Sequence, residues 1–171
     1  MPVVTADPAP ATERGDLRAI LEFTEFVGSK ARSLQQRERI VRAARVPVTS
    51  ANVVALRIVA RHGPIAVSEV AKRLGVDQST ASRQLRPLEE HGLVTRAGDD
   101  NDRRVAWLSA TAKGRNALAR LDDVIMNDFD VALGDWSAED RAALATLLDR
   151  FRTGLQQTRT DASGWSISNG L

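Results

Sequence analysis

The stretch that decides the fold is residues 67–104, VSEVAKRLGVDQSTASRQLRPLEEHGLVTRAGDDNDRR. Two short segments with apolar residues at helical spacing are separated by Gly75, and a brief apolar run and a loop rich in Asp and Arg follow them. Glycine readily ends a helix, and Asp77 is a residue type that caps the start of the next one. The stretch therefore predicts a helix-turn-helix followed by a charged hairpin, or wing.

The second predicted helix has two chemically different faces, because each residue rotates by about 100° around its axis. Ala81, Leu85 and Leu88 fall on the face that we expect to dock on the core. The opposite face has no acid before Glu90, and its candidate DNA-binding residues are Gln78, Ser79, Thr80, Ser82, Arg83 and Arg86. Arginine can bind guanine O6 and N7 or a phosphate through two hydrogen bonds, and a helix N-terminus supplies amide donors. We therefore predict that this face is presented to a DNA duplex.

The predicted wing consists of two strands, residues 93–96 and 105–108, joined by a polar loop. At the loop tip Asp102 precedes Arg103 and Arg104. A carboxylate can hold an arginine while the guanidinium enters a narrow minor groove or lies on phosphates, so these three residues are the candidate wing contacts. An ordinary solvated helix face and an ordinary charged hairpin tip are the alternatives. The succession of helix, glycine turn, helix and arginine-bearing hairpin favours DNA.

Pro87 is the main irregularity of the second helix. It lacks an N–H, so it removes the hydrogen bond to the carbonyl of Arg83, and it can kink the helix. A contact between Arg86 and DNA is therefore less firmly expected than one by Arg83.

The flanking sequence predicts further helices. Residues 1–14 are rich in Pro, Ala and Thr and predict a disordered arm, whereas residues 16–45 predict a long amphipathic helix that Gly28 and Ser29 could bend and Pro47 stops. Residues 50–62 predict a helix buried beneath others, and residues 65–67 a brief strand. Residues 111–133 and 138–157 predict two more helices, the second capped by Ser137 with Asp140, and residues 158–171 a frayed tail.

Composition favours a mainly helical fold with a small hairpin wing. Of the 171 residues 43% are hydrophobic and only 4% aromatic, which is too few for a chain built mainly of strands. The net charge is +2, so the argument for DNA depends on where the arginines lie and not on bulk charge. No leader-like segment or membrane-length apolar run is found, and we expect a soluble cytoplasmic protein without membrane contact.

The sequence lacks the residues that several other kinds of site require. There is no Cys, which excludes disulfides, thiolate metal ligands and cysteine nucleophiles. His62 and His91 have no metal partners at useful spacing, and we interpret them as structural or helix-end residues. Without a phosphate-binding glycine loop or a nucleophile motif, we expect no catalytic residue, no cofactor and no metal site.

These motifs resemble those of the MarR family of winged helix-turn-helix regulators. The segment SEVAKRLGVDQSTASRQLRPLEEHGLVTR is similar to the two DNA-reading helices and the first wing strand of that family, and Asp102, Arg104, Thr111, Gly114 and Arg115 match its wing pattern. The resemblance covers about residues 16–157 and is specific for residues 68–115. Ala66 replaces the usual Ser or Thr cap, and Ala110 replaces the usual Leu.

The resemblance implies a domain plan and a set of partners. Residues 15–46 and 111–157 would be dimerisation helices, and residues 47–110 the DNA-binding region, with residues 78–86 in the major groove and Asp102 positioning Arg104 at the minor groove or backbone. The implied protein is a homodimeric regulator that binds double-stranded DNA at a pseudo-palindromic operator, as a repressor that responds to a small aromatic or apolar effector. Phe23 and Phe26 could line an effector crevice, although helical core is the favoured interpretation of Phe23. The alternative is a winged-helix protein–protein interaction module that does not bind DNA.

Overall fold

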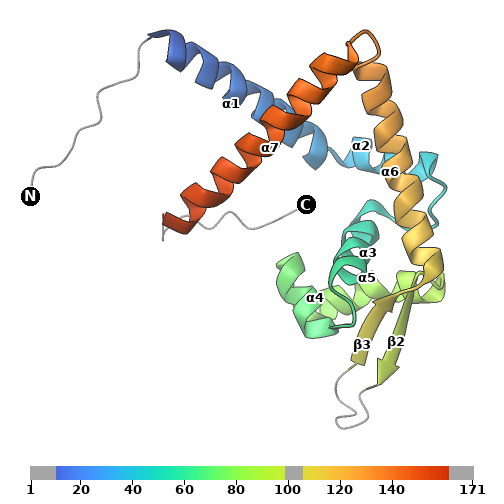
Figure 1. Ribbon diagram of the computed structural model, residues 1–171. Coiled ribbons are helices and arrows are strands. Elements are labelled where there is room, and N and C mark those ends of the chain that lie inside the picture. The colour runs from blue at the N-terminus through green and yellow to red at the C-terminus, as the bar shows by residue number, and fades with distance from the viewer. Residues whose placement is uncertain (1–10, 99–105, 162–171) are drawn as a thin grey trace, which may run out of the picture. The chain divides into compact units, whose positions relative to one another are not determined.

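The computed structural model describes residues 11–98 and 106–161, and the side chains of residues 14–98 and 106–157. The chain divides into two compact units, residues 1–39 and residues 40–171. The elements are α1 (Ala11–Arg32), α2 (Leu34–Ala43), α3 (Ser50–His62), β1 (Ile65–Ala66), α4 (Val67–Leu74), α5 (Gln78–Glu90), β2 (Val94–Gly98), β3 (Ala106–Ala110), α6 (Ala112–Ala132) and α7 (Ala138–Asp161) (Figure 1). The predicted fold class, mainly helical with a small sheet, is confirmed.

The N-terminal unit corrects two predictions. Helix α1 begins at Ala11, so residues 11–14, which were expected to be disordered, are helical, and residues 1–10 lie outside the described part of the chain. The helix passes through Gly28 without a break and ends one residue before Ser33. A single glycine weakens a helix by only about 1 kcal/mol. The hydroxyl of Ser33 instead accepts a hydrogen bond from the backbone N–H of Gln36 (3.3 Å), as a cap at the start of α2 does.

The apolar face of α1 is solvent-exposed in the single chain. Its large apolar side chains, Leu17, Ile20, Leu21, Phe23, Phe26 and Val27, are all exposed. Phe23 and Phe26 are each 57% exposed, so the interpretation of Phe23 as helical core is wrong for the single chain. An apolar stripe of this kind on a helix is normally covered in a folded protein.

Helix α3 lies at the centre of the second unit. Val53, Leu56 and Val59 are buried, as the nearly continuous apolar pattern of this helix predicted. Around it pack α4, α5, α6 and the sheet (Figure 1). Thr49 caps its N-terminus through a reciprocal pair of hydrogen bonds with Asn52.

The sheet has three antiparallel strands in the order β1-β3-β2. Residues Ile65 and Ala66 pair with Leu108 and Trp107, so Val67, predicted as strand, instead begins α4. Strands β2 and β3 pair from Val94 with Ala110 through Gly98 with Ala106. Residues 97 and 98, predicted to lie in the loop, thus extend the first wing strand. The remaining loop, residues 99–105, lies outside the described residues.

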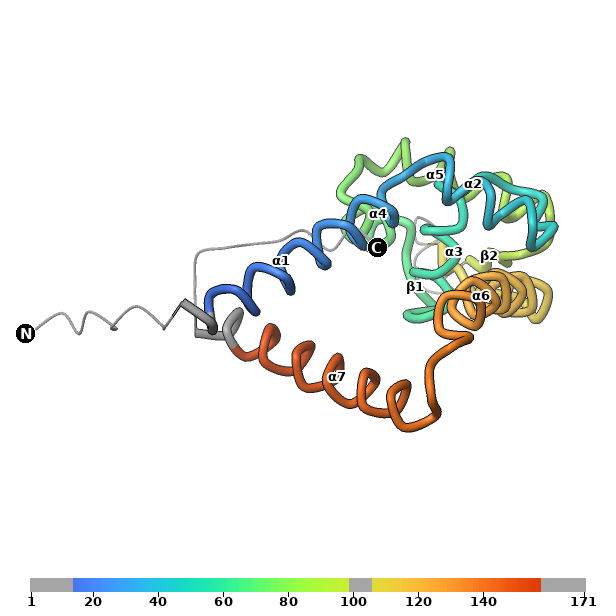
Figure 2. Tube along the Cα trace, turned by 90° about the horizontal axis from the view of Figure 1, so that it is seen from above, coloured from blue at the N-terminus to red at the C-terminus, as the bar shows by residue number. Residues whose placement is uncertain are grey.

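Helix α6 joins the wing through a close-packed N-terminus. The hydroxyl of Thr111 accepts a hydrogen bond from the backbone N–H of Gly114 (3.0 Å) and donates one to the carbonyl of Gly92 (2.7 Å). A Cβ atom on Gly114 would lie 2.1 Å from the carbonyl oxygen of Leu93, which is far too close for a non-bonded contact. Glycine, which has no Cβ atom, therefore fits at this position. The following residues Ala117, Leu118 and Leu121 are buried, and α6 packs beside α3 (Figure 2).

Helix α7 is capped as predicted but is longer than predicted. Ser137 accepts a hydrogen bond from the backbone N–H of Asp140 (3.0 Å). The helix continues four residues past Gln157 to Asp161, so the first part of the expected frayed tail is helical. Its large apolar side chains Leu147, Leu148, Phe151 and Leu155 are exposed. Within residues 11–98 and 106–161, no helix is both long and apolar enough to span a membrane.

Candidate nucleic-acid interface

The N-terminus of α5 is organised by Asp77, as predicted. Its carboxylate accepts hydrogen bonds from the backbone N–H (2.9 Å) and the hydroxyl (2.7 Å) of Thr80, and from the hydroxyl of Ser79. The hydrogen bonds from the hydroxyls of Ser79 and Thr80, and to a smaller extent the bond from the Thr80 backbone N–H, hold the pKa of the Asp77 carboxyl well below its ordinary value. The hydroxyl protons of Ser79 and Thr80 are therefore donated to Asp77, which leaves their oxygens available as acceptors.

The two faces of α5 divide as the helical phase predicted. The docking residues Ala81, Leu85 and Leu88 are each 0% exposed. On the other face, Gln78, Ser79, Arg83 and Arg86 are exposed, and Thr80 and Ser82 are half-buried. The structure thus brings all six candidate residues of this helix onto one accessible surface beside the Asp77 cap, which we call the α5 face.

The two arginines of the α5 face have different partners. The guanidinium of Arg83 donates to the Thr80 hydroxyl oxygen (3.0 Å), so this side chain lies back toward the N-terminus of α5. Arg86 instead forms an exposed ion pair with Glu90 (2.7 Å) one turn further along. A carboxylate at this distance competes with any phosphate or base for Arg86, which makes Arg83 the stronger candidate for a DNA contact.

Pro87 does not interrupt α5, which runs as one helix from Gln78 to Glu90. The side-chain amide of Asn52 on α3 donates a hydrogen bond to the carbonyl of Gln84 (2.8 Å), in the turn where Pro87 removes a backbone donor. Asn52 is buried, and it was not singled out from the sequence. The available signal was a polar residue on the buried side of an otherwise apolar helix.

The base of the wing is linked to α5 by a second residue that sequence reasoning missed. The guanidinium of Arg96 on β2 forms a two-pronged ion pair with the carboxylate of Glu89, with Nη2 to Oε1 at 2.7 Å and Nε to Oε2 at 3.1 Å. Hydrogen bonding to Glu89 raises the pKa of Arg96 above its ordinary value. The predicted wing contacts Asp102, Arg103 and Arg104 lie outside the described residues.

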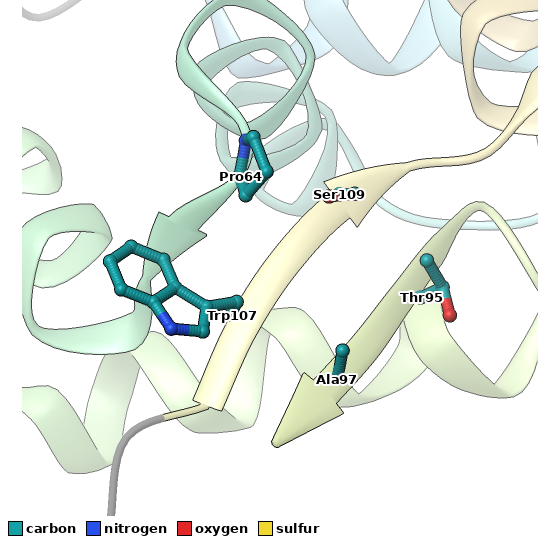
Figure 3. A pocket seen from close by; sticks show the side chains of 5 residues that line it. All are labelled: Pro64, Thr95, Ala97, Trp107 and Ser109. Atoms are coloured by element: carbon teal, nitrogen blue, oxygen red, sulfur yellow. The ribbon is translucent and has the colours of Figure 1, made fainter. Parts of the chain in front are cut away.

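The outer face of the sheet carries a shallow hollow of about 490 Å³ (Figure 3). It is lined by Pro64, Thr95, Ala97, Trp107 and Ser109. The indole of Trp107 lies beside the end of the first strand and is 37% exposed. Trp107 thus covers part of the outer face of the sheet.

A second hollow of about 1030 Å³ lies on α3, α4 and α6. Its rim carries several cationic side chains, two of which are neutralised: Arg57 pairs with Asp122 (2.6 Å) and Arg73 with Glu69 (3.0 Å). His62, the last residue of α3, lies 3.3 Å from a guanidinium nitrogen of Arg73. His91 is the C-cap of α5, so both histidines are helix-end residues, as interpreted from the sequence. No cluster of three potential metal ligands occurs in the described part of the chain.

Comparisons with known proteins agree with this geometry. Residues 48–106 match the model of the MarR family. The HTH-type transcriptional regulator YxaD of Bacillus subtilis is 32% identical over 95 residues, which are 56% of this chain and 66% of that protein. A putative transcriptional regulatory protein for the hcr operon of Thauera aromatica is 34% identical over 98 residues, 56% of this chain and 57% of that protein. These alignments thus span less than two thirds of either relative.

Solved structures share the fold over a larger part of the chain. The multiple antibiotic-resistance repressor MarR of Listeria monocytogenes superposes with a TM-score of 0.68 at 18% identity, covering 85% of this chain and 98% of that one. Streptococcus pneumoniae FabT, solved in complex with DNA, gives a TM-score of 0.57 at 23% identity, covering 83% and 99%. The family match contains α3, α4, the capped α5 and β2, and it ends at the first residue of β3. Over residues 48–106 the chain is therefore similar to the MarR family, and it shares its fold with the solved repressor MarR of Listeria monocytogenes.

Proposed function

We propose that this protein regulates transcription by binding a specific DNA operator through the α5 face. The observation that carries the proposal is the division of α5, whose apolar side is fully buried while Arg83 and the polar residues around it are accessible. A helix that is anchored in this way can place side chains against base edges in a major groove. Streptococcus pneumoniae FabT, which shares this fold and was solved in complex with DNA, supports this use of the fold.

Within the α5 face we assign the reading of bases to Arg83. Its fork of donors matches the guanine edge, and each good two-pronged contact discriminates against a wrong base by about 1–3 kcal/mol. Gln78, Ser79, Thr80 and Ser82 would approach bases or phosphates near the helix N-terminus, and Arg86 would have to leave Glu90 to join them. For the wing we retain Asp102, Arg103 and Arg104 as proposed contacts with the minor groove or the backbone.

We propose that the protein acts as a homodimer. The apolar side chains of α1 and those of α7 are uncovered in the single chain, and large exposed apolar surfaces mark interfaces. In this proposal residues 15–46 and 111–157 provide the dimer contacts, and residues 47–110 bind DNA. A two-fold dimer would place its two α5 helices in successive major grooves, about 34 Å apart, and would select a pseudo-palindromic operator.

The proposal extends to repression in the cytoplasm and to release of DNA by a small aromatic or apolar effector. The exposed rings of Phe23 and Phe26 are candidate contacts for such a ligand. A ligand can change DNA binding only if it prefers one spacing of the two α5 helices over the other. Titrating candidate ligands into the DNA complex tests this part, and release by none of them would remove the effector from the proposal.

The test of DNA binding is a mobility-shift titration of the full-length protein against the DNA upstream of its own gene, repeated at several salt concentrations. We expect Arg83→Ala and Arg104→Ala each to weaken binding and to lower the salt slope by about one. Arg61→Ala is the matched control, since Arg61 lies on α3 beside the second hollow and not on the α5 face. Absence of a salt-dependent complex would favour the alternative, a module that binds protein, and unchanged binding in both variants would remove the assigned residues.

A further inference from the structure

We propose that the Glu89–Arg96 ion pair is a brace that fixes the direction of the wing relative to α5, and so positions the wing for DNA. This inference rests on the proposed function for its consequence, but the brace itself is a property of the free protein. Glu89 belongs to the helix that we assign to the major groove, and Arg96 to the strand that leads into the wing. The pair therefore connects the two DNA-reading elements directly.

The geometry of the pair distinguishes it from ordinary surface ion pairs. The guanidinium meets both carboxylate oxygens, with Nη2 to Oε1 at 2.7 Å and Nε to Oε2 at 3.1 Å. The two side chains are only 38% and 29% exposed. Two parallel bonds restrict rotation as well as distance, and partial burial reduces screening by water and salt. By contrast, the Arg86–Glu90 pair joins two exposed residues of the same helix and constrains no other element.

The position of Arg96 along β2 explains why a brace is needed there. Leu93 and Val94 anchor the start of the strand in the core, whereas Thr95, Arg96, Ala97 and Gly98 are exposed. The third strand, β1, supports β3 over only two residue pairs, and a two-stranded hairpin is barely stable by itself. Beyond Val94, the ion pair of Arg96 with Glu89 thus connects the exposed part of β2 to α5 through side chains.

The strand register puts Arg96 on the side of the sheet that faces α5. Arg96 pairs with Leu108, which is fully buried, whereas the neighbouring pair of Ala97 with Trp107 lies at the outer hollow. Successive residues of a strand point to opposite faces, so the alternation places Arg96 over the helix. Hydrogen bonding to Glu89 also raises the pKa of Arg96, in agreement with a close contact between the guanidinium and the carboxylate.

The brace also has an electrostatic consequence at the DNA surface. A carboxylate at position 89 without a partner would repel the phosphates of a duplex bound to α5. Arg96 neutralises this charge, so it favours DNA binding without touching DNA. Glu89 and Arg96 are therefore positioning residues, and loss of either should affect the wing more than the α5 face.

The experiment combines hydrogen exchange of the free protein with DNA footprinting, in the full-length chain. The variants are Glu89→Gln, Arg96→Gln and the charge-swapped double variant Glu89→Arg/Arg96→Glu. The control is Glu69→Gln, which breaks an ion pair of similar exposure within α4. We expect each single variant to speed amide exchange of residues 94–98 about fivefold, the upper range for an ion pair of this kind, while α3 exchange is unchanged. The swapped variant should restore exchange to within about twofold, and the control should not differ from wild type.

On DNA, the single variants should lose protection at the outer, wing-side positions and keep protection at the major groove. Unchanged exchange in both single variants, or no restoration by the swap, overturns the brace whether or not DNA is bound. Faster exchange with an unaltered footprint overturns the positioning role alone. Failure of the wild-type protein to bind DNA overturns the proposed function, and the exchange data then still decide on the brace.

Discussion

The hydrogen bond from Asn52 to α5 gives the sharpest prediction about how the structure is held. Asn52 is 7% exposed. Its side-chain oxygen accepts from the backbone N–H (3.0 Å) and the hydroxyl (2.7 Å) of Thr49, and its amide nitrogen donates to the carbonyl of Gln84 (2.8 Å). Asn52→Ala removes all three bonds. At about 0.5–1.5 kcal/mol for each bond, the free energy of unfolding should fall by about 2–3 kcal/mol.

A second substitution separates the two functions of Asn52. Asn52→Asp keeps the oxygen acceptors for Thr49 but replaces the donor to Gln84 with a second acceptor, which faces a carbonyl oxygen. If Asn52 acted only as a cap, this variant would be as stable as wild type, because Asp suits the start of a helix. We expect instead a loss of at least about 1 kcal/mol at neutral pH, since the second carboxylate oxygen would face the Gln84 carbonyl without a hydrogen-bond donor.

The assay is urea unfolding of the full-length protein followed by circular dichroism, with Asn116→Ala as the matched control. Asn116 lies on an exposed position of α6, so its removal should change the free energy of unfolding by no more than about 0.5 kcal/mol. A wild-type stability for Asn52→Asp would refute the claim that Asn52 anchors α5. A loss below about 0.5 kcal/mol for Asn52→Ala would refute both the anchor and the cap.

Three further predictions concern other parts of the chain. Gly114→Ala should destabilise the protein by about 3 kcal/mol, because the new methyl group would overlap the Leu93 carbonyl. Gly154→Ala has open space at its Cβ position and should instead stabilise α7 by about 0.5–1 kcal/mol. Thermal unfolding of the two variants compares these effects, and equal effects would be inconsistent with the Leu93 contact. The Asp77 carboxyl has a lowered pKa in the folded protein, so its contribution to stability is present above the ordinary Asp pKa of about 3.9 and is lost as the pH falls through the lower folded value. The melting temperature of wild type should therefore fall more steeply than that of Asp77→Asn as the pH is lowered below about 4, and parallel curves would contradict this account. Leu148→Glu should convert the proposed dimer to a monomer in sedimentation experiments, because it places a charge on the apolar face of α7, and an undiminished dimer would exclude this face from the interface.

The parts of the fold that were predictable from sequence depend on local chemistry. The burial of Ala81, Leu85 and Leu88 follows from helical phase alone, and Asp77 and Ser137 were recognisable as caps from their own side chains. The predicted bounds of α3, about residues 50–62, agree with the observed helix, since Pro47 and Gly63 enclose a mostly apolar segment. In each case the deciding interaction lies within a few residues of sequence.

The parts that were not predictable depend on contacts between distant residues or on competing local bonds. Asn52 and Gln84 are 32 residues apart, and a polar residue in an apolar helix does not reveal which carbonyl it will meet. The Glu89–Arg96 pair required the path of the turn into β2. The Arg86–Glu90 pair, in contrast, follows from four-residue spacing and was predictable from the sequence. The break between α1 and α2 lies at Ser33, whose hydroxyl caps α2, and not at Gly28, where the sequence predicts a bend.

The most direct test of the central claim, that α5 reads bases through Arg83, is operator selection from random duplexes with wild type, Arg83→Ala and the control Arg61→Ala. The account predicts that Arg83→Ala loses the preference at a single base pair in each half-site, worth about 1–3 kcal/mol, and keeps the rest of the selected sequence. Arg61→Ala should select the wild-type sequence. An identical selected sequence for wild type and Arg83→Ala would contradict the claim.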